Sequence, residues 1–209
     1  MKYLYKAVNA ILSIAIIPAA IFLEFLFVQM STSLLDVGLE ESFSLKRFYD
    51  IFVSGKDPFS YMIKEDTVFY WPDSLNPIKP YLIAFIVFFA LAIIAALFIF
   101  IWSICSNKRI PVIIASAAGI VFSILMSVFF AKGADFFISG TVNIVDALAG
   151  GGFVASLISG FVSVDTFMLG GFKNAFIILF VVIILWTLAF IIVDLDDEKE
   201  PKPEKSKKN

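Results

Sequence analysis

Two small polar residues and one carboxylate stand inside the first apolar run of the chain, and they are the best candidates for chemistry. Asn9, Ser13 and Glu24 recur at steps that keep side chains on one face of a helix. A carboxyl group within a membrane is costly, so it normally faces protein or water, is paired, or stays protonated. The pattern predicts an intramembrane polar site for a cation or a proton. The alternative is that Glu24 reaches the outer interface or pairs with a nearby base such as Lys46 or Arg47.

Other residue types that catalysis or metal binding commonly need are scarce. The chain has no histidine and one cysteine, Cys105, which removes intrachain disulfides, most zinc and haem sites, and histidine-based acid and base catalysis. The tetrapeptide GKDP at 55–58 lacks the rest of a phosphate-binding loop. The sequence therefore predicts no cofactor and no metal. An enzyme that uses Glu24 or an outer aspartate is the least favoured class, because no second catalytic partner is evident.

Four apolar runs position these residues: 7–30, 81–104, 110–131 and 175–193. Each is long enough to cross a bilayer, which needs roughly 20 residues at about 1.5 Å per residue. Apolar residues make up 60% of the chain, more than a soluble domain carries. In lipid every backbone polar group must be bonded internally. We therefore predict an all-α integral membrane protein, with residues 1–193 as one domain of four transmembrane helices and small helical caps outside the membrane.

Basic residues near the ends of the runs predict the orientation. With the amino terminus inside, a dense set of bases falls on the cytoplasmic side, whereas five bases are spread along residues 31–80 of the first outer loop. The inner set is Lys2, Lys6, Lys108, Arg109 and the five lysines of the tail. Neither glycosylation sequons nor paired loop cysteines occur. We expect a multi-pass plasma-membrane protein of bacterial type with both termini in the cytoplasm and a disordered, charged tail at 194–209.

The third run carries small residues at steps of three or four. They are Ser116, Gly119, Ser123 and Ser127. Small side chains let another helix approach closely, and such packing drives much of the helix association in lipid. The spacing predicts a helix-packing face. A polar translocation path lined by serine hydroxyls is the alternative.

The first outer loop, residues 31–80, is predicted to form a folded cap. Ser44 is placed to cap a short amphipathic helix that ends before Gly55. The loop is too aromatic for a disordered linker. We predict that Phe48, Phe52 and the later Trp71 form a surface that binds a partner protein. The alternative is that the cap covers the ends of its own helices.

The second outer loop, residues 132–174, is unusually apolar and rich in glycine. Residues 153–168 form an apolar stretch that is interrupted by Gly160 and is too short for a clear crossing. Broken segments of this kind occur where backbone re-enters a membrane to line a cavity. The alternative is a pair of interfacial helices packed on the outer rim of the bundle.

These features favour a non-enzymatic accessory or scaffold subunit of a membrane complex. It would contact a partner membrane protein, or further copies of itself, through its outer loops and small-residue helix faces. The second hypothesis is a small, oligomeric channel or transporter whose path is lined by Glu24 and the glycine-rich segment 150–171. The lipid bilayer is an expected partner in both cases, and nucleic acid in neither.

Overall fold

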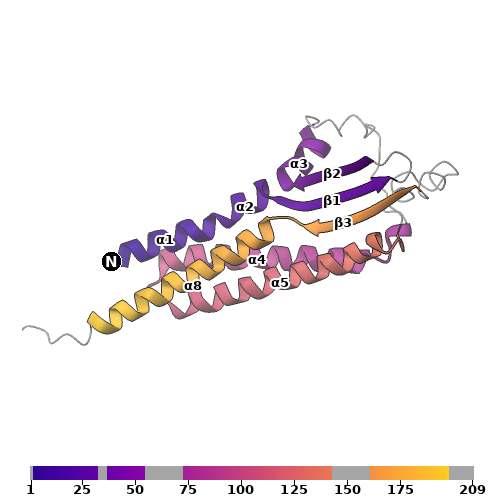
Figure 1. Cartoon of the computed structure of the whole chain (residues 1–209). Coiled ribbons are helices and arrows are strands. Elements are labelled where there is room, and N and C mark those ends of the chain that lie inside the picture. The colour runs from indigo at the N-terminus through magenta and orange to yellow at the C-terminus, as the bar shows by residue number, and fades with distance from the viewer. Residues whose placement is uncertain (1, 33–36, 55–72, 143–160, 198–209) are drawn as a thin grey trace, which may run out of the picture.

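A computed structural model describes residues 2–32, 37–54, 73–142 and 161–197 of the protein (Figure 1). Within these ranges four helical segments are long and apolar enough to cross a membrane. They are Tyr3–Phe22, Lys79–Cys105, Ile110–Ile138 and Phe172–Val193. The molecule is therefore mostly helical with four candidate spans, as the sequence predicts, but a small sheet accompanies them.

The first span consists of two helices, α1 (Lys2–Ile14) and α2 (Ile16–Phe22). The break at Ala15 lies one turn before Pro18, whose ring has no N–H to donate and crowds the carbonyl four residues earlier. The span ends at Phe22, because Leu23 is already extended with φ −74° and ψ 147°. The prediction that this helix runs to residue 30 is wrong. Short apolar runs suit both helix and strand, and here strand pairing decides the outcome.

Three strands form an antiparallel sheet in the order β2-β1-β3. The strands are β1 (Glu24–Thr32), β2 (Val37–Ser44) and β3 (Val162–Leu169). The expectation of purely helical caps is thus wrong, and so is a helix over residues 162–168. The remainder of the stretch predicted as broken helices, residues 153–160, lies outside the described part of the chain. Helical periodicity cannot reveal that a distant segment will complete the hydrogen bonds of β1.

The remaining three spans lie in the helices α4 (Lys79–Cys105), α5 (Ile110–Ile138) and α8 (Phe172–Asp197). A short link joins α4 and α5 into an antiparallel pair, and the Trp102 indole fixes this link by donating to the Lys108 carbonyl at 3.0 Å. At about 1.5 Å per residue α5 is about 44 Å long, against roughly 30 Å of hydrocarbon. The ends of α4 and α5 that are distant from their link therefore extend beyond the span formed by α1 and α2, and the sheet lies beside these extensions (Figure 1).

A cluster of phenylalanine rings joins the sheet to the helices. The Phe25 ring of β1 lies 5.8 Å from Phe85 of α4 and 5.7 Å from Phe172 at the start of α8, measured between ring centroids. Phe167 of β3 stacks on Phe130 of α5 at 5.7 Å. Each such pair is worth about 0.5–1.5 kcal/mol beyond its buried area. The sheet is therefore held on the bundle by packed rings and not only by its covalent connections.

One glycine permits the backbone of the sheet to meet the start of α8. A Cβ added at Gly170 would lie 1.9 Å from the Glu24 carbonyl oxygen. The Gly170 amide also donates to the Phe25 carbonyl at 2.8 Å. A side chain would force these two backbones apart and weaken the phenylalanine cluster beside them.

We predict that Gly170→Ala lowers the free energy of unfolding by about 1–3 kcal/mol, since backbone atoms cannot yield as a side chain can. Gly171→Ala is the matched control, because no atom lies within 4 Å of its added Cβ. Thermal unfolding in detergent and limited proteolysis would measure both variants. Equal stability of the two variants would contradict the close approach.

Candidate functional site

The polar residues predicted on the first span lie inside the bundle. Asn9 is 0% and Ser13 is 1% exposed. The Asn9 amide donates to the Thr187 hydroxyl of α8 at 3.4 Å, and the Ser13 hydroxyl donates to the Asn9 carbonyl at 2.7 Å. All of these groups are neutral. The Asn9–Thr187 bond links α1 to α8.

Glu24 does not belong to this intramembrane group, which corrects the predicted polar site. It is the first residue of β1, is exposed, and lies two residues beyond the end of the first span. Its carboxylate accepts a hydrogen bond from the Ser42 hydroxyl of β2 at 2.9 Å. Strand formation after Leu23 turns the chain out of the helix, so the helical spacing from Asn9 to Glu24 has no structural counterpart. The alternative pairings are also not formed, because Lys46 bonds Asp50 and Arg47 bonds Glu41.

At the end of the bundle that carries the amino terminus, an arginine side chain packs against aromatic rings of two helices. The Arg109 guanidinium, at the start of α5, lies 5.1 Å from the centre of the Tyr5 ring and donates to the Phe190 carbonyl. Nearby, Lys6 donates to the Ile104 carbonyl at 3.1 Å. These contacts bring α1, α4, α5 and α8 together and place basic residues at the same end of the bundle.

The small residues of α5 face the interior of the same chain. Ser116 and Ser123 are 0% exposed, Gly119 is buried, and Ser127 is half-buried. The Phe180 ring of α8 lies directly over Gly119, where an added Cβ would come within 2.4 Å of the ring. The two serine hydroxyls donate to carbonyls one turn earlier in α5. This face of α5 is therefore filled by Phe180 of the same chain instead of being free for another protein.

We predict that Gly119→Ala lowers the free energy of unfolding by about 1–3 kcal/mol, because the fully buried Phe180 ring has little room to move. Gly133→Ala is the control on the same helix, since the nearest atom to its added Cβ, the Tyr81 Cβ, is at an ordinary 3.5 Å. Both changes gain the same helix propensity, so their difference isolates the clash. Adding Phe180→Leu to Gly119→Ala should restore part of the lost free energy of unfolding, because the smaller side chain leaves room for the added Cβ. Unfolding in mixed detergent micelles would give the three values, and indistinguishable variants would contradict the packing.

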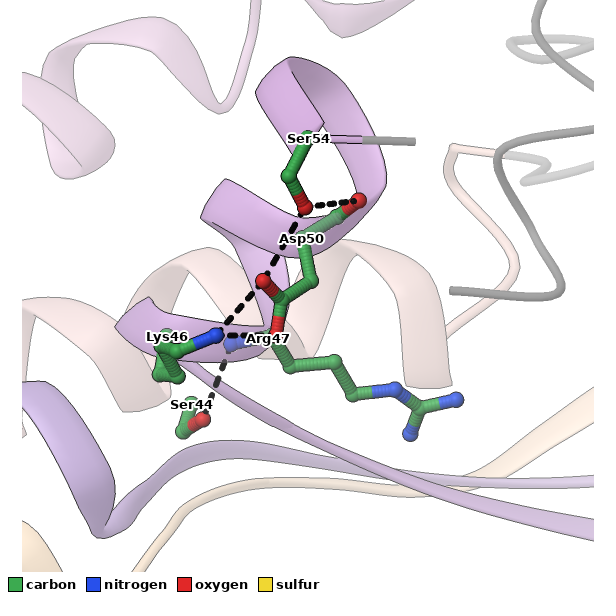
Figure 2. A network of polar contacts seen from close by, with 5 residues as sticks. All are labelled: Ser44, Lys46, Arg47, Asp50 and Ser54. Carbon is green, nitrogen blue, oxygen red and sulfur yellow. Dashed lines mark hydrogen bonds and ion pairs between the residues drawn. The ribbon is translucent and has the colours of Figure 1, made fainter. Parts of the chain in front are cut away.

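The amphipathic helix predicted in the first loop is present as α3 (Leu45–Tyr49), continued by the π-helical turn η1 (Asp50–Ser54). The Ser44 hydroxyl caps it by accepting from the Arg47 amide at 3.1 Å, as the sequence predicts. Figure 2 shows how Asp50 then joins the two segments, since it pairs with Lys46 and accepts from the Ser54 hydroxyl at 3.1 Å. The network keeps α3 and η1 as one element.

The aromatic residues proposed for partner binding have different positions. Phe48 is half-buried and packs on Phe25 and Phe43, with ring centroids 5.6 Å and 5.5 Å away. It therefore belongs to the junction between α3 and the sheet. The side chain of Phe52 and the whole of Trp71 lie outside the described residues.

A surface that the sequence did not reveal is one face of the sheet. Its six polar residues come from all three strands and are joined across them by hydrogen bonds. Gln29 donates to Glu40 at 2.7 Å, and the Ser31 and Ser163 hydroxyls are bonded at 3.0 Å. We call this surface the polar sheet face, and its members are Gln29, Ser31, Glu40, Ser42, Ser163 and Thr166.

The opposite face of the sheet is covered, which explains why these polar groups point outward. Val28 is 6% exposed, and Phe167 beside it contacts Phe130 and Phe137 of α5. Glu41 on this covered side is neutralised by Arg47 at 2.7 Å. Alternation along β1 and β2 places their polar members on the exposed side, and the register shift between Gln29 and Met30 in the pairing with β3 brings both Ser163 and Thr166 to that side. A period-two signal was available in the sequence, but it was hidden within an apolar run read as helix.

The polar sheet face carries negative charge. Glu40 is exposed, and Glu24 lies at its edge through the bond to Ser42. Neither carboxylate forms an ion pair with another described residue. Among the parts of the chain that the structure describes, no group of three or more metal-ligating side chains lies together. The polar sheet face thus offers hydrogen-bonding groups and negative charge.

Comparison with known proteins adds no family: no protein-family model, no curated protein and no solved structure matches this chain.

Proposed function

We propose that the protein is a non-enzymatic accessory or scaffold subunit of a membrane complex and that it binds a partner protein through the polar sheet face. The four-helix bundle would anchor this surface in a plasma membrane of bacterial type. We further propose that the termini are cytoplasmic and the sheet is outside. The basic residues Lys6, Lys108 and Arg109 at the end of the bundle opposite the sheet support this orientation.

One observation supports the proposal above the others: the exposed side chains of the polar sheet face are hydrogen-bonded to one another. Side chains that already hold one another lose less conformational freedom when a partner binds. Gln29 is bonded to Glu40 and lies within 3.4 Å of the Thr166 hydroxyl, so one amide links all three strands. The carboxylates of Glu24 and Glu40, which form no ion pair with a described residue, favour a partner that presents basic or hydrogen-bond-donating groups.

The interior of the bundle favours the role of a membrane anchor over that of a channel or transporter. Phe180 fills the face of α5 at Gly119, and charged residues within the four spans lie near their ends. For this reason we place the partner contact on the sheet and not on the small-residue helix face. The partner is either another membrane protein or a second copy of this chain.

The alternative of a channel or transporter relied on Glu24 and the segment 150–171. Glu24 lies outside the span, and residues 150–160 fall beyond the described ranges. At the end of that segment, Gly170 is used for close backbone contact with Glu24. Asn9 and Ser13 remain as neutral groups between helices. We find no feature of the described residues that favours transport over anchoring.

We predict that Ser163→Arg abolishes stoichiometric association with the partner without loss of folded protein. The reason is that a long cationic side chain would replace a small hydroxyl in the polar sheet face. Ser139→Arg is the matched control, because Ser139 is also exposed, lies at the end of α5 beyond the span, and bonds one neighbouring hydroxyl. The measurement is gentle-detergent purification from native membranes, with mass analysis of the intact complex.

Retention of the same partner by Ser163→Arg would exclude the polar sheet face as the contact. A homogeneous assembly of this chain alone, lost only in Ser163→Arg, would identify the partner as another copy. A monomer with no stoichiometric partner in native membranes would overturn the scaffold proposal altogether.

A further inference from the structure

An apolar stripe is exposed along α3 and η1. Leu45, Tyr49 and Val53 recur at steps of four, and they are 36%, 54% and 67% exposed. The opposite side of this element faces the protein, because Phe48 packs on the sheet and Ile51 is 7% exposed. Water is an unfavourable environment for three neighbouring apolar side chains on one side of a helical element.

The pairing of β1 with β2 fixes the level at which the stripe begins relative to the end of the first span. Ser44 at the end of β2 is paired with Glu24 at the start of β1. Glu24 lies two residues after Phe22, where the first span ends. The helix that follows Ser44 therefore begins at the boundary of the span. Contacts between α2 and α3 agree with this level, and Figure 1 shows α3 near the end of α2 and next to β2.

We propose that α3 and η1 lie in the membrane interface and that lipid covers the stripe of Leu45, Tyr49 and Val53. Phe22, the last residue of the first span, is 64% exposed, so the span itself presents an apolar side chain at the level where the stripe begins. Tyrosine is a preferred residue at this depth, where its ring is in apolar surroundings and its hydroxyl is hydrated.

The charges of the element fit the same position. Lys46 is exposed beside the stripe and pairs with Asp50. On the protein side, Arg47 pairs with Glu41. An apolar side with charged groups next to it is the composition of an interfacial amphipathic helix. The sheet would then be supported at two places, by the phenylalanine cluster on the bundle and by α3 on the lipid surface.

Fluorescence depth measurements on the full-length protein in liposomes test this proposal. The background variant is Cys105→Ser, which removes the single cysteine of the chain. An environment-sensitive fluorophore is then attached to Val53→Cys or Leu45→Cys on the stripe, or to Ser163→Cys on the polar sheet face. Circular dichroism and the melting profile establish that each labelled protein is folded, which is expected because Leu45, Val53 and Ser163 are exposed.

We expect lipids brominated near the headgroup to quench most of the emission at both stripe positions, while aqueous iodide leaves it unchanged. The label at residue 163 should show the reverse. Iodide quenching at residues 45 and 53 as strong as that at 163 in pure liposomes would overturn the proposal. Protection that appears only in native membranes would also overturn it and would assign the stripe to a partner protein instead.

Discussion

The Phe25 ring is the contact on which the arrangement of the whole molecule depends. It lies immediately beyond the first span and touches rings from three other elements, Phe48 of α3, Phe85 of α4 and Phe172 of α8. Because β1 follows directly from α2, this one position fixes the direction in which the chain leaves the membrane. Burial of several aromatic rings in one place offsets the conformational entropy lost in ordering the strands.

The position of the polar sheet face follows from that junction. Phe25 and Phe167 attach one side of the sheet to the helices, while Gln29, Ser31 and Ser163 face outward, because the pairing of β1 shifts register after Glu24 against β2 and after Gln29 against β3. A small sheet needs an apolar face or a helix to pack against, and α5 and α3 supply apolar contacts of this kind. The same contacts that stabilise the sheet therefore also orient the surface that we propose for binding.

The interior of the bundle is organised for close packing. Gly119 admits the Phe180 ring, and Asn9 and Thr187 share a hydrogen bond across α1 and α8. In lipid, apolar burial gives little drive for helices to associate, so close contacts of this kind carry much of the stability. Arg109 closes the opposite end with rings from α1 and α8. The bundle is consistent with a rigid anchor for an exposed domain.

Local sequence was sufficient to identify four helices long and apolar enough to cross a membrane, the Ser44 cap and the small residues along α5. Each of these depends on local composition, because a bilayer of fixed thickness selects long apolar runs and a cap acts within one turn. The end of the first span at Phe22 and the position of Glu24 beyond it became evident only in the folded molecule. The reason is that β1 becomes a strand by bonding β2 and β3, and Ser31 meets Ser163 across 132 positions of sequence. No local pattern contains the partner that a strand requires, so the sheet and its polar face depended on tertiary structure.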